Sequence, residues 1–173
     1  MKYGKFVKKY DLFAIFIFIV LIFSIFSINV VADEKKGSQK SYFTSYLSTN
    51  DLCIYISSGF LLGFTLNAGA EFVLGQWNIS NVLPIDYSLG GKFIFNGYSG
   101  HIGISPVFMI HIGFSGINLE LYQGIGIGVK IPDGATFTEI AGLNWFINKN
   151  LSIIFEYAYI GFSSWGIGIM FKI

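Results

Sequence analysis

Charged residues are scarce in this chain of 173 residues. Asp, Glu, Lys and Arg together make up 12% of the sequence, whereas a soluble domain usually carries about 25%, so a conventional soluble surface is not expected. The 11 basic residues are all Lys, so the chain lacks the planar bidentate donor typical of nucleic-acid readers. The single cysteine, Cys53, excludes an intrachain disulfide framework and a metal site built from several cysteines.

Apolar residues and glycine are abundant instead. The sequence is 53% hydrophobic and 18% aromatic, and it contains 21 Gly. Nearly all of these glycines lie from Gly59 onward, which argues against an extended helical protein because glycine weakens helices. The length fits one domain of ordinary size.

The first 32 residues have the pattern of an export signal. Four lysines precede an apolar run over 12–28, and Val30-Val31-Ala32 forms a cleavage site before Asp33. The apolar run is longer than a usual signal core, so an uncleaved membrane anchor is the alternative. The polar segment 33–50 has no clear period and is predicted to be a flexible, solvated lead-in.

From residue 51 to the end of the sequence, apolar and small residues alternate with period two, which is typical of β-strands. No other stretch is apolar for long enough to span a bilayer as a helix. Turn signals such as Pro132-Asp133-Gly134 and Asn148-Lys149-Asn150 separate the alternating segments. The predicted strands are 52–60, 64–77, 85–97, 101–114, 117–130, 135–147, 151–160 and 164–173.

One hairpin allows a test of register. A two-residue turn at Ser115-Gly116 pairs residues so that bulky apolar side chains of both strands share one face, and small or polar side chains share the other. This register places His101 beside Lys130 and His111 beside Glu120. The small face carries mostly Gly, Ser and Ala, which suits a narrow interior better than a solvated surface.

The large face carries Ile, Leu, Phe, Tyr and Trp, which suits contact with acyl chains. A sheet in hydrocarbon must close on itself, because unpaired backbone groups there are costly. The fold class is therefore predicted to be all-β, an antiparallel up-and-down transmembrane β-barrel of about eight strands after a cleavable signal helix. Aromatic girdles are expected at one rim from Phe60, Phe64, Phe95, Tyr98, Tyr159, Phe162 and Trp165, and at the other from Trp77, Trp145 and Phe171.

With its export signal and its alternating last segment WGIGIMFKI, the chain resembles the small eight-stranded outer-membrane barrels of the OmpA and OmpX type over 51–173. The last strand of such barrels usually ends in Phe or Trp, whereas here Phe171 lies two residues before Ile173. The resemblance implies a bacterial outer-membrane location and contact with outer-membrane lipids. It also implies assembly by the barrel-assembly machinery, and a monomer is expected.

Alternation directs a set of ionisable side chains into the barrel. Glu71 and Lys92 are expected to meet directly or diagonally near mid-barrel, since buried charges need partners. The network is predicted to be a self-satisfied polar plug, with a proton relay or ion path as the alternative. Its predicted members are Glu71, Lys92, His101, His111, Glu120, Lys130 and Glu156.

No catalytic, cofactor-binding or metal site is predicted. His101, Ser105 and Glu120 have the residue types of a hydrolase, but the strand positions keep them apart. The expected function is a structural or surface-interacting outer-membrane barrel. A lipid-modifying enzyme or narrow pore is the alternative, and a soluble secreted barrel behind an uncleaved anchor is a third possibility.

Two residues do not fit a regular barrel. Pro106 falls in mid-strand, where it removes a backbone donor, so a β-bulge is expected there. Glu139 falls on the lipid face if its strand keeps register with Phe137 and Leu143. It then lies near the rim, or a bulge turns it inward.

Overall fold

The computed structural model describes residues 42–59, 63–79 and 83–173, and residues 41–173 form one compact unit. The predicted signal peptide over 1–32, the first part of the predicted lead-in and Phe60 lie outside the described residues. Within the described ranges, the chain has no helix that is long and apolar enough to cross a membrane.

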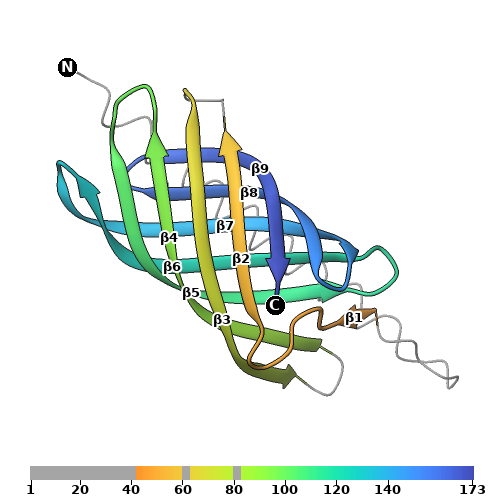
Figure 1. Cartoon of the computed structure of the whole chain (residues 1–173). Coiled ribbons are helices and arrows are strands. Elements are labelled where there is room, and N and C mark those ends of the chain that lie inside the picture. The colour runs from red at the N-terminus through yellow and green to blue at the C-terminus, as the bar shows by residue number, and fades with distance from the viewer. Residues whose placement is uncertain (1–41, 60–62, 80–82) are drawn as a thin grey trace, which may run out of the picture. The chain divides into compact units, whose positions relative to one another are not determined.

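Nine strands lie in the described part of the chain (Figure 1), and the eight long ones confirm the predicted segments to within about two residues at each end. They are β1 (Phe43–Thr44), β2 (Leu52–Gly59), β3 (Thr65–Ile79), β4 (Leu83–Asn96), β5 (Ile102–Phe114), β6 (Leu119–Ile131), β7 (Gly134–Asn148), β8 (Leu151–Ile160) and β9 (Ser163–Lys172).

The eight strands β2 to β9 form a closed antiparallel barrel. Each strand pairs with the next along the chain, and β9 pairs back to β2. Leu52 and Ile173 exchange two backbone hydrogen bonds of 3.1 and 2.9 Å at the seam. Closure therefore leaves no long unpaired edge, as a sheet in hydrocarbon requires. We call the end with Leu52 and Ile173 the terminal end and the opposite end the distal end.

The strands are staggered around the barrel. If cross-strand partners are followed from Leu52 through each strand in turn, the path reaches β9 at Ser163. Leu52 itself, however, is hydrogen-bonded to Ile173, so the ladder is displaced by about ten residues along β9. Such a stagger tilts the strands by roughly 35–45° to the barrel axis, and Figure 1 shows front and back walls crossing at a wide angle. The partners on this path are Phe72, Leu89, Phe108, Ile125, Glu139 and Tyr159.

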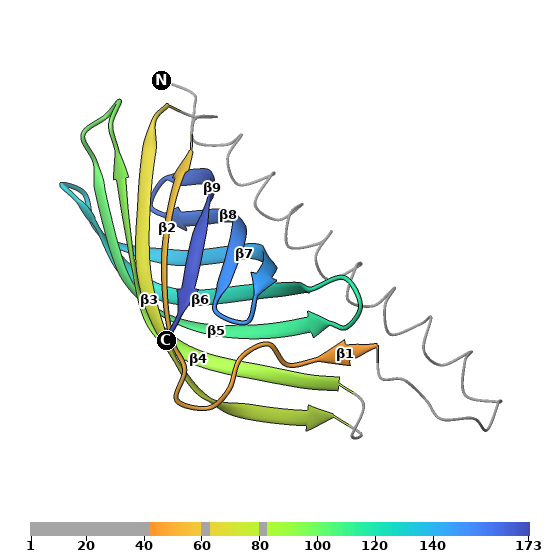
Figure 2. The same ribbon diagram turned by 45° about the vertical axis from the view of Figure 1, so that its right-hand side comes forward.

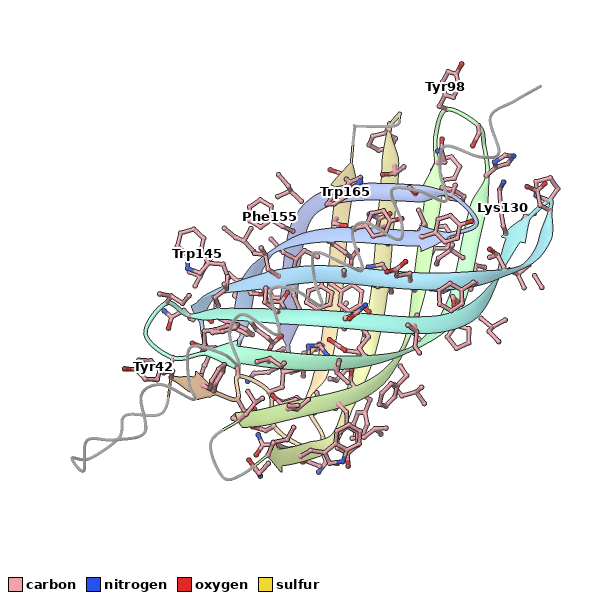
Figure 3. All side chains as sticks on the ribbon, turned by 180° about the vertical axis from the view of Figure 1, so that it is seen from behind. Tyr42, Tyr98, Lys130, Trp145, Phe155 and Trp165 are labelled. Carbon is pink, nitrogen blue, oxygen red and sulfur yellow. The ribbon has the colours of Figure 1, made fainter. Side chains whose placement is uncertain are left out.

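The alternation sorts the side chains into an outer apolar face and a filled interior. Trp145, Phe155 and Trp165 point away from the barrel wall (Figure 3). The exposed large apolar residues include Ile54, Ile56, Phe72, Leu89, Ile104, Phe108, Ile125, Ile127, Phe137, Ile167, Ile169 and Phe171. The buried interior includes Cys53, Tyr55, Val73, Ile94, Val107, Met109, Tyr122, Ile140, Ile154 and Met170.

The predicted register of the β5–β6 hairpin is wrong by two residues. Phe114 pairs with Leu119, so the turn has four residues rather than two. Gly116 and Asn118 both take positive φ, at 91° and 53°, and this extends the turn to Asn118. A shift of two preserves the faces, because side chains alternate with period two.

The shift changes the predicted cross-strand partners on these strands, although the predicted His111–Glu120 contact still forms, diagonally, at 3.1 Å. His111 lies opposite Tyr122 rather than Glu120, and Lys130 lies opposite Gly103 rather than His101. The apolar outer face and the inner face of small and polar residues are nevertheless those predicted, because a shift of two residues leaves every side chain on the same face.

Pro106 does not create the expected bulge. It pairs with Gly91 of β4, and the β5–β6 register is the same on both sides of it. The missing N–H interrupts the ladder to β6 without inserting a residue. Register shifts occur instead between Val73 and Gly75 and between Phe146 and Asn148.

Glu139 keeps the outward parity of its strand. The β6–β7 register runs without a shift through Glu139, which pairs with Ile125 and Tyr159. No bulge turns its side chain inward, and it lies one pair from the distal end of the β7–β8 ladder. The inward bulge is thus wrong, and the side chain stays on the outer parity of β7, where it is only 7% exposed.

Two interior tyrosines lie over glycines of neighbouring strands. A Cβ at Gly69 would lie 2.3 Å from the Tyr55 ring, and one at Gly142 would lie 2.5 Å from the Tyr122 ring. Glycine at these positions gives each ring its space in a narrow lumen. The small interior residues are therefore part of the packing of the large ones.

Replacing Gly142 by Ala will displace the Tyr122 ring and lower the free energy of unfolding by about 1–3 kcal/mol. The control is Gly91→Ala, because a Cβ at Gly91 meets nothing within 4 Å, and we expect a change within about 0.5 kcal/mol. Urea unfolding in lipid vesicles measures both. Equal effects of the two substitutions would contradict this account of the packing.

Candidate functional site in the barrel interior

Five of the seven predicted network residues are buried inside the barrel. Glu71, Lys92, His111, Glu120 and Glu156 come from five different strands, and each is at most 3% exposed. They form two groups of contacts, one around Lys92 and one around His111. Glu71 and Lys92 lie diagonally across the β3–β4 ladder, as predicted, but the ion pair of each is with another residue.

The Lys92 group is an ion pair supported by two tyrosines. Lys92 Nζ donates to Glu156 Oε1 across the lumen, and the Tyr122 hydroxyl donates to Glu156 Oε2 at 3.0 Å. Lys92 Nζ also lies 4.3 Å from the centre of the Tyr55 ring. A buried charge pair is tolerated when its remaining donors and acceptors have partners, and here both carboxylate oxygens are used.

The His111 group places an imidazole between two carboxylates. His111 Nε2 lies 3.1 Å from Glu71 Oε2, and Nδ1 lies 3.1 Å from Glu120 Oε1. Both nitrogens can donate at once only when the ring carries both protons. Ser88 Oγ also donates to Glu71, and Asn144 Nδ2 donates to Glu120 Oε1 at 2.7 Å.

Ser88, His111 and Glu120 have the order of a catalytic triad. Ser88 Oγ lies 3.2 Å from His111 Nε2, and Glu120 binds the opposite nitrogen. However, the Ser88 proton is donated to Glu71, which also occupies Nε2. Ser88 is 0% exposed, so its hydroxyl does not contact solvent. The arrangement holds charges in place and offers no accessible nucleophile.

His101 and Lys130 lie apart from these groups. Both are at the distal end, where Lys130 Nζ bonds Asp133 Oδ2 at 2.5 Å within the β6–β7 turn. This bond holds the pKa of the Asp133 carboxyl below its usual range. The His101 ring instead lies 6.3 Å from the Phe162 ring, so the predicted His101–Lys130 contact is wrong.

An uncharged polar layer fills the distal half of the interior. The hydroxyls of Thr65 and Ser164 lie 2.7 Å apart, and Ser164 donates to Asn67 at 3.1 Å. Asn67 donates in turn to Ser57 at 3.0 Å. The predicted network omitted these residues and Ser88, because it considered ionisable groups. Their inward parity in the alternating pattern was the signal that could have found them.

Residues 42–50, which we call the strap, close the terminal end. We expected a solvated lead-in here, but β1 pairs with β5 and Leu47 is 3% exposed. The expectation failed because Phe43, Tyr46 and Leu47 supply apolar anchors that their polar neighbours obscure in the sequence. Figure 2 shows β1 alongside the barrel strands at this end.

Five barrel strands hold the strap, and on β3 the Val73 carbonyl accepts a hydrogen bond of 2.9 Å from Asn50 N. The Tyr46 ring stacks on Phe146 of β7 at 4.6 Å, and its hydroxyl donates to the Phe114 carbonyl of β5 at 2.9 Å. Burial raises the pKa of Tyr46, and the charge of Glu120 adds to this effect. Lys172 Nζ of β9 donates to the Tyr46 carbonyl at 2.6 Å. Ser45 donates to Asp86 of β4 at 2.6 Å.

Four buried side-chain atoms in the described interior have no hydrogen-bond partner. They are Tyr55 Oη, Glu120 Oε2, Asn144 Oδ1 and Ser152 Oγ. Such atoms are uncommon in native interiors, and each one has a desolvation cost. Within the same described residues, no group of three His, Cys, Asp or Glu could hold a metal ion.

No protein-family model matches the chain, and no curated protein matches it. Solved structures do match its fold. A de novo designed transmembrane β-barrel has 17% sequence identity and a TM-score of 0.56, with 73% of this chain and 98% of that chain covered. The solution NMR structure of the de novo designed TMB2.3 has 15% identity and a TM-score of 0.51, over 73% of this chain and 96% of that chain.

A natural barrel is also similar. The N-terminal β-barrel domain of Pseudomonas aeruginosa OprF has 15% identity and a TM-score of 0.50, with 73% of this chain and 100% of that domain covered. At such identities the likeness shows the fold alone. The chain is thus an eight-stranded antiparallel barrel of the transmembrane type, and its resemblance to the small OmpA-like barrels is confirmed at the level of architecture.

Proposed function

We propose that this protein is a small, non-enzymatic barrel of the bacterial outer membrane, with a structural role or an interaction role carried by its rim. The observation that carries the proposal is the combination of an apolar outer face with an interior filled by its own side chains. Outer-membrane lipids are its partners along the outer face, and it is exported by its N-terminal signal, inserted by the barrel-assembly machinery and monomeric.

The interior contacts favour this function over a pore. Lys92 and Glu156 neutralise each other across the lumen, and both side chains are at most 1% exposed. The strap covers the terminal end. An eight-stranded barrel is just wide enough to be filled by side chains, so an ion would have to displace paired charges to pass.

The same contacts favour it over an enzyme. The Ser88 hydroxyl is buried and already bonded to Glu71. A lipid substrate approaching from the outer face would meet the sheet backbone and apolar side chains. The interior groups therefore serve stability, which makes their contribution to unfolding the quantity to measure.

Denaturing-gel migration and intact mass test the location and the closed barrel. We expect protein extracted from envelopes to migrate faster unboiled than boiled, because a closed barrel resists detergent unfolding until heated. The mass should start at Asp33 if the signal is cleaved as its sequence predicts. Protein without a heat shift and with residues 1–32 retained would instead support an anchored protein of the inner membrane.

Reconstitution in planar bilayers tests for conduction and lipid cleavage. The folded protein is expected to carry no steady single-channel current and to release no fatty acid from outer-membrane lipid. Boiled protein is the control for contaminants. A steady current would support the pore, whereas lipid cleavage that is lost in Ser88→Ala would support the enzyme.

Removing one charge of the Lys92–Glu156 ion pair should lower the free energy of unfolding more than removing both charges. Lys92→Met leaves the Glu156 carboxylate buried without its cation, and we expect a loss of about 3–5 kcal/mol in unfolding free energy. The double variant Lys92→Met with Glu156→Leu should lose less than the single variant, because no charge remains. Urea titration in vesicles compares them, and additive losses would show that the pair is not coupled.

A further inference from the structure

The strap packs against the interior side chains at the terminal end of the barrel. Leu47 belongs to the same buried apolar cluster as Cys53 and Phe146. Cys53 is 0% exposed and lies on β2 opposite Lys172. The Lys172 ammonium donates a hydrogen bond to the Tyr46 carbonyl of the strap. Access to Cys53 from the terminal end therefore requires the strap to move.

The closed position leaves polar atoms unsatisfied beneath the strap. Glu120 lies opposite Asn144, and Ser152 lies opposite Phe146, on which Tyr46 stacks. Each of these three polar residues has one side-chain oxygen without a partner, and all three are buried. Water that entered at this end would supply the missing hydrogen bonds.

The attachments of the strap are of a kind that water can replace. Lys172 to Tyr46, Ser45 to Asp86 and Tyr46 to Phe114 are single hydrogen bonds. Two single backbone bonds, from Asn50 N to the Val73 carbonyl and from Ser115 N to the Tyr42 carbonyl, are the others near the two ends of the strap. β1 has only two residues, so its ladder to β5 is short. Closure is stabilised mainly by burial of Phe43, Leu47 and Tyr46, whereas opening is stabilised by hydration of the layer below.

We propose that the strap is a reversible plug of the terminal mouth, which opens without unfolding the barrel and admits water to the lumen floor around Cys53, Glu120, Asn144 and Ser152. The barrel wall does not depend on the strap, because β2 to β9 close on themselves. The plug and the barrel can therefore be tested separately.

The native thiol of Cys53 reports on opening. A charged methanethiosulfonate reagent is added to the folded full-length protein in detergent, and labelling is followed by mass. We expect slow but complete labelling of the wild type while its unboiled migration stays that of the folded barrel. If the folded protein stays unlabelled for many times the period that urea-unfolded protein needs to react completely, the strap is fixed and the proposal is overturned. Labelling as fast as that of unfolded protein would show an open mouth.

Two strap variants sharpen the test. Leu47→Ser removes the apolar anchor, and Lys172→Gln removes the cation that binds the Tyr46 carbonyl and lies 3.3 Å from Asp51. Each should speed Cys53 labelling at least about tenfold while the barrel remains heat-modifiable. Tyr98→Ser at the distal end is the matched control and should leave the rate unchanged, and Cys53→Ser should abolish labelling. Wild-type rates in both folded strap variants would overturn the proposal.

Discussion

Backbone hydrogen bonding is the constraint on which this structure depends. A sheet that contacts hydrocarbon must pair every strand edge, and the chain meets this demand by joining β9 to β2. Eight staggered strands then enclose a narrow lumen. That narrowness explains why the inward face carries so much glycine and why Tyr55 and Tyr122 lie over glycines of the next strand.

The charges of the lumen follow from the same geometry. The closed barrel brings together residues that are far apart in sequence, so Lys92 reaches Glu156 and His111 reaches Glu71, whereas Glu120 reaches His111 from the neighbouring strand of the same hairpin. Burial makes each of these groups depend on its partner. The interior contacts therefore link side chains across one, two or four strands, in addition to the backbone hydrogen bonds between neighbours, and Lys92–Glu156 joins opposite walls.

Period-two alternation made the fold and the two faces predictable from the sequence, because it depends only on parity. Register was harder, since the turn after Phe114 includes Asn118 in a left-handed conformation that the Ser115-Gly116 pair did not suggest. The inward ionisable residues of the site could be named, but most of their partners could not, and the His111–Glu120 contact is the exception. Lys92 pairs across the lumen, and neither its distance to Glu156 nor the fold of the strap follows from strand-by-strand reading.

The tyrosines seated on glycines also constrain how such a sequence can change over time. A larger residue at Gly142 requires a smaller residue at position 122, and the same holds for Gly69 with position 55. A Cβ would also need the Phe155 or Gly91 carbonyl oxygen, at 2.6 and 2.7 Å, to shift. Related sequences should therefore conserve the summed volume of each pair rather than either residue alone. Coupled substitution at these pairs offers a way to find relatives of this barrel whose overall sequence similarity has been lost.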